Sequence, residues 1–320
     1  MRSQSPTASA RPALADWLSL LALTVMWGSA FALTKLAVAG LSPEAVVATR
    51  LVVGASLLAA LWWGSRLALP RDKRLWLFFI LIALFGNVIP FNLIAWGQVF
   101  IDSSLAGLLM AVMPLFTLVL AHFWIPGERL TWMRMIGFIL GLLGVAVLLG
   151  PGIEMDSKPN ETFLLATMAV LAGALCYAIS TILTRLRPNS DVITSAAATT
   201  SIGAILMLAT VRPAATIDQL EVTSLGVLGA VLMLGVFSTA LAAVLYFRLI
   251  ERAGPTFVSQ LNYLIPLWAV LLGALMFGER PVMTDYLAMM IILGGIAVSQ
   301  RAPQSQLAKQ RAVAARQADR

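Results

Sequence analysis

The sequence predicts an all-α polytopic membrane protein with ten transmembrane helices in two inverted five-helix repeats. The 320 residues are 60% apolar and only 12% charged, with a mean hydropathy of +0.89. A soluble protein could not cover so much apolar surface. Ten apolar runs are each long enough to cross a hydrocarbon core of ~30 Å as a helix. In addition, one pattern of residues recurs after about 150 positions, which indicates a duplication.

The clearest copies lie towards the end of each half. Pro266 corresponds to Pro114, and a Gly-Glu-Arg motif centred on Glu279 corresponds to the one centred on Glu128. Upstream, the stretch from Trp27 to Lys35 matches residues 177–185 at a constant offset of 150. We therefore expect a cytoplasmic leader (1–15), a first five-helix repeat (16–150), a linker (151–160), a second inverted repeat (161–300) and a basic cytoplasmic tail (301–320).

The apolar runs follow one another closely and do not alternate with polar residues, which favours helices over barrel strands. Only 151–160 and 212–221 leave room for longer loops. The first run ends in a small-residue stretch that a signal peptidase could cut, but its repeat partner indicates that it stays as a span. The expected spans are about 16–36, 44–64, 74–98, 104–125, 131–150, 162–184, 191–211, 222–248, 255–277 and 283–300.

Basic residues predict the orientation. With a cytoplasmic N-terminus, 17 of the 22 lysines and arginines fall on the cytoplasmic side, so both termini are expected there. An odd number of spans per half then inserts the halves in opposite senses, with Glu128 facing the cytoplasm and Glu279 facing outside. Inverted repeats around a midplane site are typical of alternating-access transporters.

Several classes of function are disfavoured. The single cysteine, Cys176, and the single histidine, His122, leave no disulfide, metal site or cofactor chemistry to expect. The net charge of +7 comes from loops and the tail, so it reports topology rather than nucleic-acid binding. All fifteen carboxylates lie at span ends, in loops or in tails. A proton relay is therefore not expected, which favours facilitated or exchange transport.

Polar groups interrupt several spans. Amides in hydrocarbon need partners, and proline frees a carbonyl, so these groups should face a cavity or another helix. The alternative is that they serve only as hydrogen bonds between helices. Likewise, Pro114 and Pro266 are either kinks set by packing or direct contacts. The interrupting residues are Asn87, Pro90, Asn92, Trp96 and Gln98 in the third span, Tyr177, Ser180 and Thr181 in the sixth, Ser238, Thr239 and Tyr246 in the eighth, and Gln260, Asn262, Tyr263 and Pro266 in the ninth.

Two cations need an explanation. Lys35 ends its helix, where its stem would reach the interface, and Arg50 lies some six residues inside the second span. Either could meet a substrate carboxylate or play a structural part; for Arg50 the structural option is a pair with Glu44. The glycines of the fifth span, Gly137 and Gly141 with Gly144, indicate close helix packing, inside one chain or in a dimer.

These residues resemble the EamA family of the drug/metabolite transporter superfamily. The likeness rests on Trp27-Gly-Ser-Ala-Phe31 with Lys35, Pro43 and Arg50, on both proline-to-glutamate spacings, and on the glycine-rich helix that closes each half. It implies two inverted five-helix repeats around a central cavity, movable fourth and ninth helices that carry Pro114 and Pro266, and export of amino acids and related metabolites. The residues that it puts on cavity-forming helices are Trp27, Asn87, Trp96, Met110, Tyr177, Ser180, Tyr246, Gln260 and Tyr263.

The second half departs from the family pattern. Tyr177-Ala-Ile replaces a Trp-Gly-Ser start, and Thr200 stands where the repeat would place a partner for Arg50. Any role of Arg50 therefore belongs to one half alone.

We expect an exporter in the bacterial inner membrane, with a small-molecule substrate and the lipid bilayer as partners and no nucleic acid; a monomer is favoured over a dimer. An aromatic or neutral amino acid would place its ring against Trp and Tyr side chains and Met110 or Met113. Its polar end would meet Asn87 or Gln260. The alternatives are a proton-coupled multidrug, purine or other metabolite exporter and, more remotely, a channel or an intramembrane enzyme, for which no filter motif or catalytic constellation is visible.

Overall fold

The computed structural model describes residues 12–126, 128, 130–150, 161–211 and 213–300, without the side chains of 213–215, 255 and 256. Throughout this part the regular structure is helical, with no strand. Most of the expected leader, the linker 151–160 and the tail 301–320 lie outside the described residues. The helices of the first half are α1 (Leu14–Val38), α2 (Pro43–Gly64), α3 (Lys73–Ala83), η1 (Leu84–Val88), α4 (Ile89–Phe100), α5 (Ser103–Met110), α6 (Met113–Trp124) and α7 (Trp132–Leu149).

The second half follows the same order of elements. Its helices are α8 (Glu161–Leu186), α9 (Val192–Thr210), α10 (Pro213–Val222), α11 (Leu225–Met233), η3 (Leu234–Leu241), α12 (Ala242–Ala253), α13 (Pro255–Val258), α14 (Leu261–Phe277) and α15 (Met283–Gln300). Nine helical stretches of the described chain are long and apolar enough to cross a membrane, and α14 is a shorter apolar helix. With α14 as the tenth span, the predicted ten-helix fold is confirmed.

The region 212–221, expected to be a loop, instead forms most of the short helix α10. Proline suits the first turn of a helix because its missing N–H would have no partner there. The amide of Gln219 holds α10 against the connection between α1 and α2, where its Oε1 accepts the backbone N–H of Ser42 at 3.0 Å. The helix therefore covers one end of the bundle and does not add a span.

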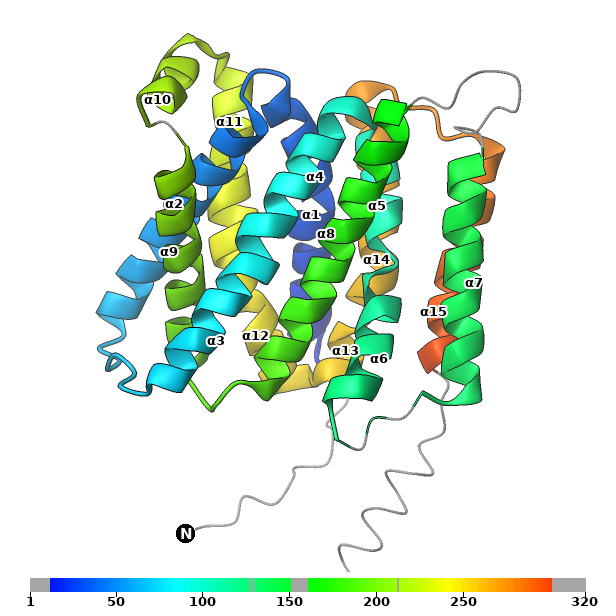
Figure 1. Cartoon of the computed structure of the whole chain (residues 1–320), viewed down its shortest axis with the longest axis horizontal. Coiled ribbons are helices and arrows are strands. Elements are labelled where there is room, and N and C mark those ends of the chain that lie inside the picture. Colours follow the sequence, from blue (N-terminus) through cyan, green and yellow to red (C-terminus); the bar gives the residue numbers. More distant parts are fainter. Residues whose placement is uncertain (1–11, 127, 129, 151–160, 212, 301–320) are drawn as a thin grey trace, which may run out of the picture.

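The two halves run in opposite senses. Helix α1 begins and α15 ends at the lower face in Figure 1, whereas the connections from α4 to α5 and from α14 to α15 lie at the upper face. The end of α6 and the start of α7 lie at the lower face, and Glu128 pairs there with Arg134, so Glu128 and Glu279 are at opposite ends of the bundle. This is the arrangement that an odd number of spans per half predicts.

Corresponding spans of the two halves share one irregularity. The third span contains the π-helix η1 and the eighth contains η3, and these begin at Leu84 and Leu234, an offset of 234 − 84 = 150 residues. In η1 the N–H of Ile89 reaches back five residues to Leu84 O, one position before Pro90, which has no N–H to give. In η3 the Thr239 hydroxyl donates to Leu234 O at 2.9 Å.

Helices α7 and α15 form a pair at one side of the bundle (Figure 1). A Cβ on Gly295 would come within 2.6 Å of Gly137 O, and a Cβ on Gly137 would strike Gly295 O. A Cβ on Gly144 would come within 2.6 Å of the Ile292 side chain. The glycines of α7 therefore permit close packing inside one chain, which is one of the two options, internal packing or a dimer contact, that their spacing allowed.

Two neighbouring glycines of α15 test this contact. We expect Gly295→Ala to lower stability by ~1–3 kcal/mol because the new methyl group overpacks the interface. Gly294→Ala is the matched control: its Cβ would meet nothing within 4 Å. That change should leave the thermal unfolding temperature in detergent unchanged or slightly higher. Equal unfolding temperatures for the two variants would contradict the assigned packing.

Candidate functional site

Trp27 joins the first span to the eighth. Its Nε1 donates to Ser238 O at 3.2 Å, and the Ser238 hydroxyl donates back to Met26 O at 2.8 Å. The Trp27 ring lies 5.1 Å from the Tyr246 ring, centroid to centroid, at 51°. The predicted residues Trp27 and Tyr246 are thus brought together, in an aromatic pair built from both halves.

The next two residues of α1 contact the ninth span. A Cβ on Gly28 would lie 2.7 Å from Trp268 Cδ1, so only glycine lets this indole approach. Trp268 Nε1 donates to the Ser29 hydroxyl at 2.9 Å. Trp27, Gly28 and Ser29 therefore bind α1 to η3 and to α14. Sequence reasoning missed Trp268, and the Gly-Ser pair opposite it was the available signal.

Arg50 lies where four helices meet. Its Nε donates to Thr239 Oγ1 at 2.9 Å, and its Cζ lies 3.7 Å from the centroid of the Phe91 ring. The Phe91 ring in turn lies 6.3 Å from that of Tyr177. Glu44 is exposed near the start of α2 and forms no ion pair with Arg50. The expected alternative of an Arg50–Glu44 pair is therefore wrong.

Two of three predicted amides reach a neighbouring helix. Asn92 Nδ2 donates to Val88 O of its own span at 2.7 Å and lies 3.2 Å from Met207 Sδ of α9. The fully buried Gln98 donates through Nε2 to a carbonyl of α1 at 2.9 Å. Asn87 Nδ2 reaches Thr199 O at 3.5 Å, the limit of a hydrogen bond. Asn92 and Gln98 therefore fit the interhelical role, and Asn87 keeps donor and acceptor capacity for a ligand.

Lys35 is structural. Its Nζ donates to Gln98 O at 3.0 Å and to Ile101 O at 2.8 Å, the carbonyl groups at the end of α4. A cation is favourable there because those carbonyls carry the negative end of the helix dipole. The ammonium group is thus engaged by two backbone carbonyls, which fits the structural option for Lys35.

Trp96 does not join the aromatic pair. Its side chain is 38% exposed and meets Phe100 edge-on, with ring centroids 5.3 Å apart. In this turn Gly97, and not Trp96, packs against α8. The contacts of Trp96 therefore do not support the pocket role expected for it. A tryptophan deep in a span can still face outward when every face of its helix is apolar.

The remaining predicted residues lie around helix breaks. Met110 and Tyr263 pack partly buried against one apolar core, and Ser180 lies against Gly86 of η1. Gln260 lies in the turn between α13 and α14, and Asn262 is the second residue of α14.

Both predicted movable spans are broken. Pro114 is the second residue of α6 and directly follows a turn at residues 111–112, whereas Pro266 lies inside α14, beyond the break at residues 259–260. The two prolines thus correspond in sequence but not in their distance from the break.

Glu279 clamps the two halves together. Its Oε1 accepts from the backbone N–H of Ser103 at 2.9 Å and from the Ser103 hydroxyl at 2.7 Å. Its Oε2 accepts from the N–H of Ser104 at 2.9 Å and from the Ser104 hydroxyl. A Cβ on Gly273 would strike this group, so the clamp needs glycine at that position. We call Glu279, Ser103 and Ser104 the Glu279 clamp.

The clamp fixes the charge state of Glu279. Burial alone would raise the pKa of its carboxyl, but the hydrogen bonds from Ser104 and Ser103 outweigh burial and hold the pKa below its ordinary value. For Asp102 beside it, burial and the negative charge of Glu279 raise the pKa. The clamp is therefore formed by an ionised carboxylate.

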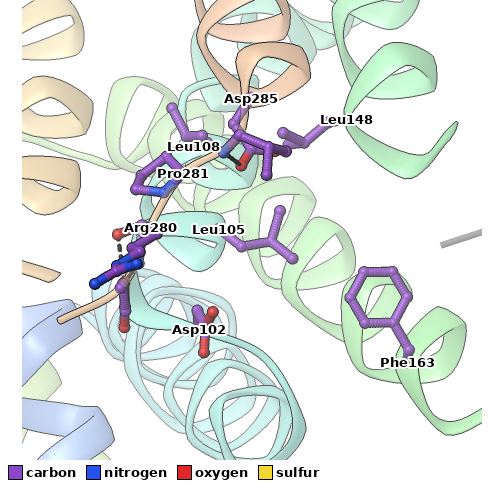
Figure 2. Close-up of a pocket in the computed structure, with 11 residues that line it drawn as sticks. Asp102, Leu105, Leu108, Leu148, Phe163, Arg280, Pro281 and Asp285 are labelled. Atoms are coloured by element: carbon purple, nitrogen blue, oxygen red, sulfur yellow. Dashed lines mark hydrogen bonds between the residues drawn. The ribbon is translucent and has the colours of Figure 1, made fainter. Parts of the chain in front are cut away.

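A small cavity adjoins the clamp (Figure 2). It measures about 140 Å³, and Asp102, Phe163, Arg280 and Asp285 are among the residues that line it. Sites for metabolites of drug-like size usually span ~300–1,000 Å³. This hollow lies at the end of the bundle, and we do not assign it to the substrate.

The corresponding glutamate at the opposite end is held differently. Glu128 pairs with Arg134 at 2.9 Å in its own half and with Arg185 of the other half at 3.5 Å. The Arg185 side chain is 52% exposed. Exposed pairs of this kind contribute ~0–1 kcal/mol, so the halves are joined more tightly at the Glu279 end.

Two inverted five-helix repeats, broken spans and a polar junction between the halves define a membrane carrier. The chain belongs to the EamA-like transporter family, which matches it twice, at residues 16–150 and 164–300. It is therefore a multi-pass membrane protein of a transporter family, as its sequence motifs predict.

Named relatives agree with this family. The chain is 24% identical over 280 residues to the uncharacterized transporter YoaV of Bacillus subtilis, covering 87% of this chain and 94% of that protein. It is 26% identical over 285 residues to the uncharacterized inner membrane transporter YedA of Escherichia coli, covering 88% and 89%. A solved crystal structure with 21% identity superposes with a TM-score of 0.59 over 89% of this chain and 96% of that one, and so shares its fold.

The clamp can be tested by a change of one atom type. In Glu279→Gln an NH₂ group faces one serine N–H and one serine hydroxyl; the hydroxyl can turn and accept, but the bond from the N–H is lost and the remaining bonds lose the negative charge of the acceptor. We expect the free energy of unfolding to fall by ~1–3 kcal/mol. Glu128→Gln, which breaks only a partly exposed ion pair, should cost ~1 kcal/mol or less. Thermal unfolding in detergent compares them; an equal loss in both variants would argue against the clamp.

Acid should remove the clamp's contribution. Because folding lowers the pKa of Glu279, its stabilisation is complete above the ordinary glutamate pKa of 4.5 and is lost as the pH falls through the lower folded value. Asp102, whose pKa is raised, acts in the opposite sense; burial, the main cause, is common to both proteins, and only the smaller part that comes from the Glu279 charge differs between them. The difference in unfolding temperature between wild type and Glu279→Gln should thus be constant from pH 6 to 8 and shrink below pH ~4.5. A difference that grows in acid would contradict the assignment.

Proposed function

We propose that this chain is an inner-membrane exporter of small amphipathic metabolites, with aromatic or neutral amino acids as the first candidates, and that it works by alternating access as a facilitator or exchanger. The main observation behind this proposal is that the two ends of the bundle are held closed unequally. Four hydrogen bonds join the halves at Glu279, whereas a partly exposed ion pair joins them at Glu128. A carrier closed at one face and weakly held at the other has this asymmetry.

The orientation of the basic residues assigns the faces. With both termini cytoplasmic, the Glu279 clamp closes the outer face and Glu128 lies at the cytoplasmic face. An exporter loads its substrate from the cytoplasm, so this closure fits a carrier ready for loading. Transport would require Ser103 and Ser104 to leave Glu279 as the halves rock.

The chemistry of the junction supports an amphipathic substrate. The Trp27–Tyr246 pair offers aromatic faces, which can receive an apolar ring or an ammonium group. Asn87 adds an amide with a single long hydrogen bond. A few polar groups on an apolar wall are what a metabolite site needs. Since no carboxylate lies in the middle of an expected span, we propose no proton relay.

Counterflow tests this function. Purified protein in liposomes loaded with unlabelled phenylalanine should accumulate external labelled phenylalanine transiently above equilibrium, with or without a proton gradient. Accumulation only with the gradient would favour the proton-coupled alternative. Absence of counterflow with phenylalanine, threonine and purines alike would refute the proposal.

Two tryptophan variants test the pocket. Trp27→Ala should slow phenylalanine counterflow by roughly fivefold, since an aromatic pair contributes ~0.5–1.5 kcal/mol beyond its buried area. Trp96→Ala, which removes an exposed indole outside the pair, is the control and should keep the wild-type rate. Both rates are normalised to folded protein in the liposomes. An unchanged rate in Trp27→Ala would exclude this ring from the substrate site.

A further inference from the structure

Arg50 is a buried cation without a buried anion. Two charged side chains of the described chain are less than a tenth exposed: Asp16 at 6% and Arg50 at 9%. Asp16 lies in the first turn of α1 and pairs with Arg252 at 3.3 Å. For Arg50, no carboxylate of the described residues lies within 4.0 Å. An unpaired charge at this depth is costly, so its presence calls for a function.

Most of the guanidinium is unused. Arginine offers five N–H donors, and only Nε of Arg50 finds an acceptor among the described residues, the Thr239 hydroxyl. The two terminal nitrogens, Nη1 and Nη2, have no such acceptor there. Neither is among the fully enclosed polar atoms that lack a partner, so each keeps some accessible surface. The edge that binds carboxylates bidentately is thus free.

The surroundings hold this edge in a fixed direction. The Phe91 ring covers one face of the guanidinium at 3.7 Å, and the Thr239 hydroxyl fixes Nε. Thr239 also donates to Leu234 O, a bond that its place in the π-helix allows. The preceding residue, Ser238, accepts the Trp27 indole N–H. Consecutive residues of η3 therefore hold the arginine on one side and the Trp27–Tyr246 pair on the other.

We propose that Arg50 is the subsite for the carboxylate of the transported molecule, an inference that rests on the proposed function and narrows its substrate class to small monocarboxylates with an apolar side chain. The planar fork of arginine matches the two oxygens of a carboxylate. Only one such group is provided, because the repeat places Thr200 where a second arginine would stand. A dicarboxylate would bring a second negative charge that has no arginine to meet it, and an amine without a carboxylate lacks the charge that matches Arg50.

The bound and empty carriers then differ in whether Arg50 is paired. With a substrate carboxylate on it the guanidinium is paired, whereas without one it stands as an unpaired positive charge in a medium of low dielectric constant. Occlusion is therefore easier with substrate bound than without it. Exchange of one monocarboxylate for another should be faster than net efflux.

Binding is tested with three phenyl compounds on wild-type protein. L-Phenylalanine and 3-phenylpropionate carry the carboxylate, and phenethylamine carries only the ammonium group. We expect both carboxylates to raise the thermal unfolding temperature and to compete with labelled phenylalanine, and phenethylamine to do neither. Equal binding of phenethylamine, or no binding of either carboxylate, overturns the subsite.

Variants then assign the contact to Arg50. Arg50→Gln should weaken phenylalanine binding roughly 10- to 100-fold, the value of a charge-assisted hydrogen bond, and Arg50→Lys by less. Thr239→Val removes the acceptor of Nε and the hydroxyl's bond to Leu234 O but keeps the cation, so it should weaken binding by a smaller factor. In the double variant Arg50→Gln/Thr239→Val, the second change should have no additional effect on binding. Arg248→Gln, at an exposed arginine of α12, is the charge-matched control and should bind as wild type. Wild-type affinity in Arg50→Gln overturns the proposal.

The failure of this inference can be told apart from the failure of the transport function. If the carboxylate subsite is wrong, counterflow of phenylalanine or another metabolite survives in Arg50→Gln at the wild-type rate. If the transport function is wrong, no compound gives counterflow in the wild type. Should Arg50→Gln not fold, the comparison of the three phenyl compounds on wild-type protein still decides the question.

Discussion

Hydrocarbon offers no hydrogen-bond partner, and this constraint shapes the whole structure. Every polar group within a span has to find its partner in the protein. Lys35 therefore meets the carbonyls that end α4, and Gln98 reaches across to α1. Ser238 and Met26 are tied by a bond between two spans of opposite halves. The polar residues thus determine which helices lie side by side.

The same constraint separates the bundle into parts with different tasks. Helices α7 and α15 meet through glycines and carry few polar groups, so their contact depends on close approach of the backbones. The junction of α1, α2, η3 and α14 instead depends on indoles, hydroxyls and one guanidinium. A pair packed backbone to backbone has one arrangement, whereas a junction of side chains can exchange its partners. We infer that motion between the halves is concentrated in the second part.

Much of the fold could be predicted from the sequence. The length and hydropathy of the apolar runs predict the spans, and the repeated motifs predict the two halves. The aromatic pair of Trp27 with Tyr246 was also within reach. The partners of Arg50 could not be predicted, because Phe91 and Thr239 are single residues on helices that are apolar all round. Such helices have no amphipathic stripe to say which face turns inward. The exposure of Trp96 was missed for the same reason. Helix α10 was missed because it follows a proline in a short polar segment.

The Glu279 clamp has a consequence for the energies of the carrier's two end states. By the repeat offset of 266 − 114 = 152, Pro255 and Thr256 correspond to Ser103 and Ser104. Proline has neither an N–H nor a hydroxyl, so a matching clamp on Glu128 could draw on two donors where Glu279 has four. At ~1 kcal/mol for each bond, that deficit corresponds to roughly a 30-fold population difference. The duplication that gave the protein two equivalent halves has thus left its two closed ends unequal in energy, and opening the Glu279 end becomes the slower step of the proposed cycle.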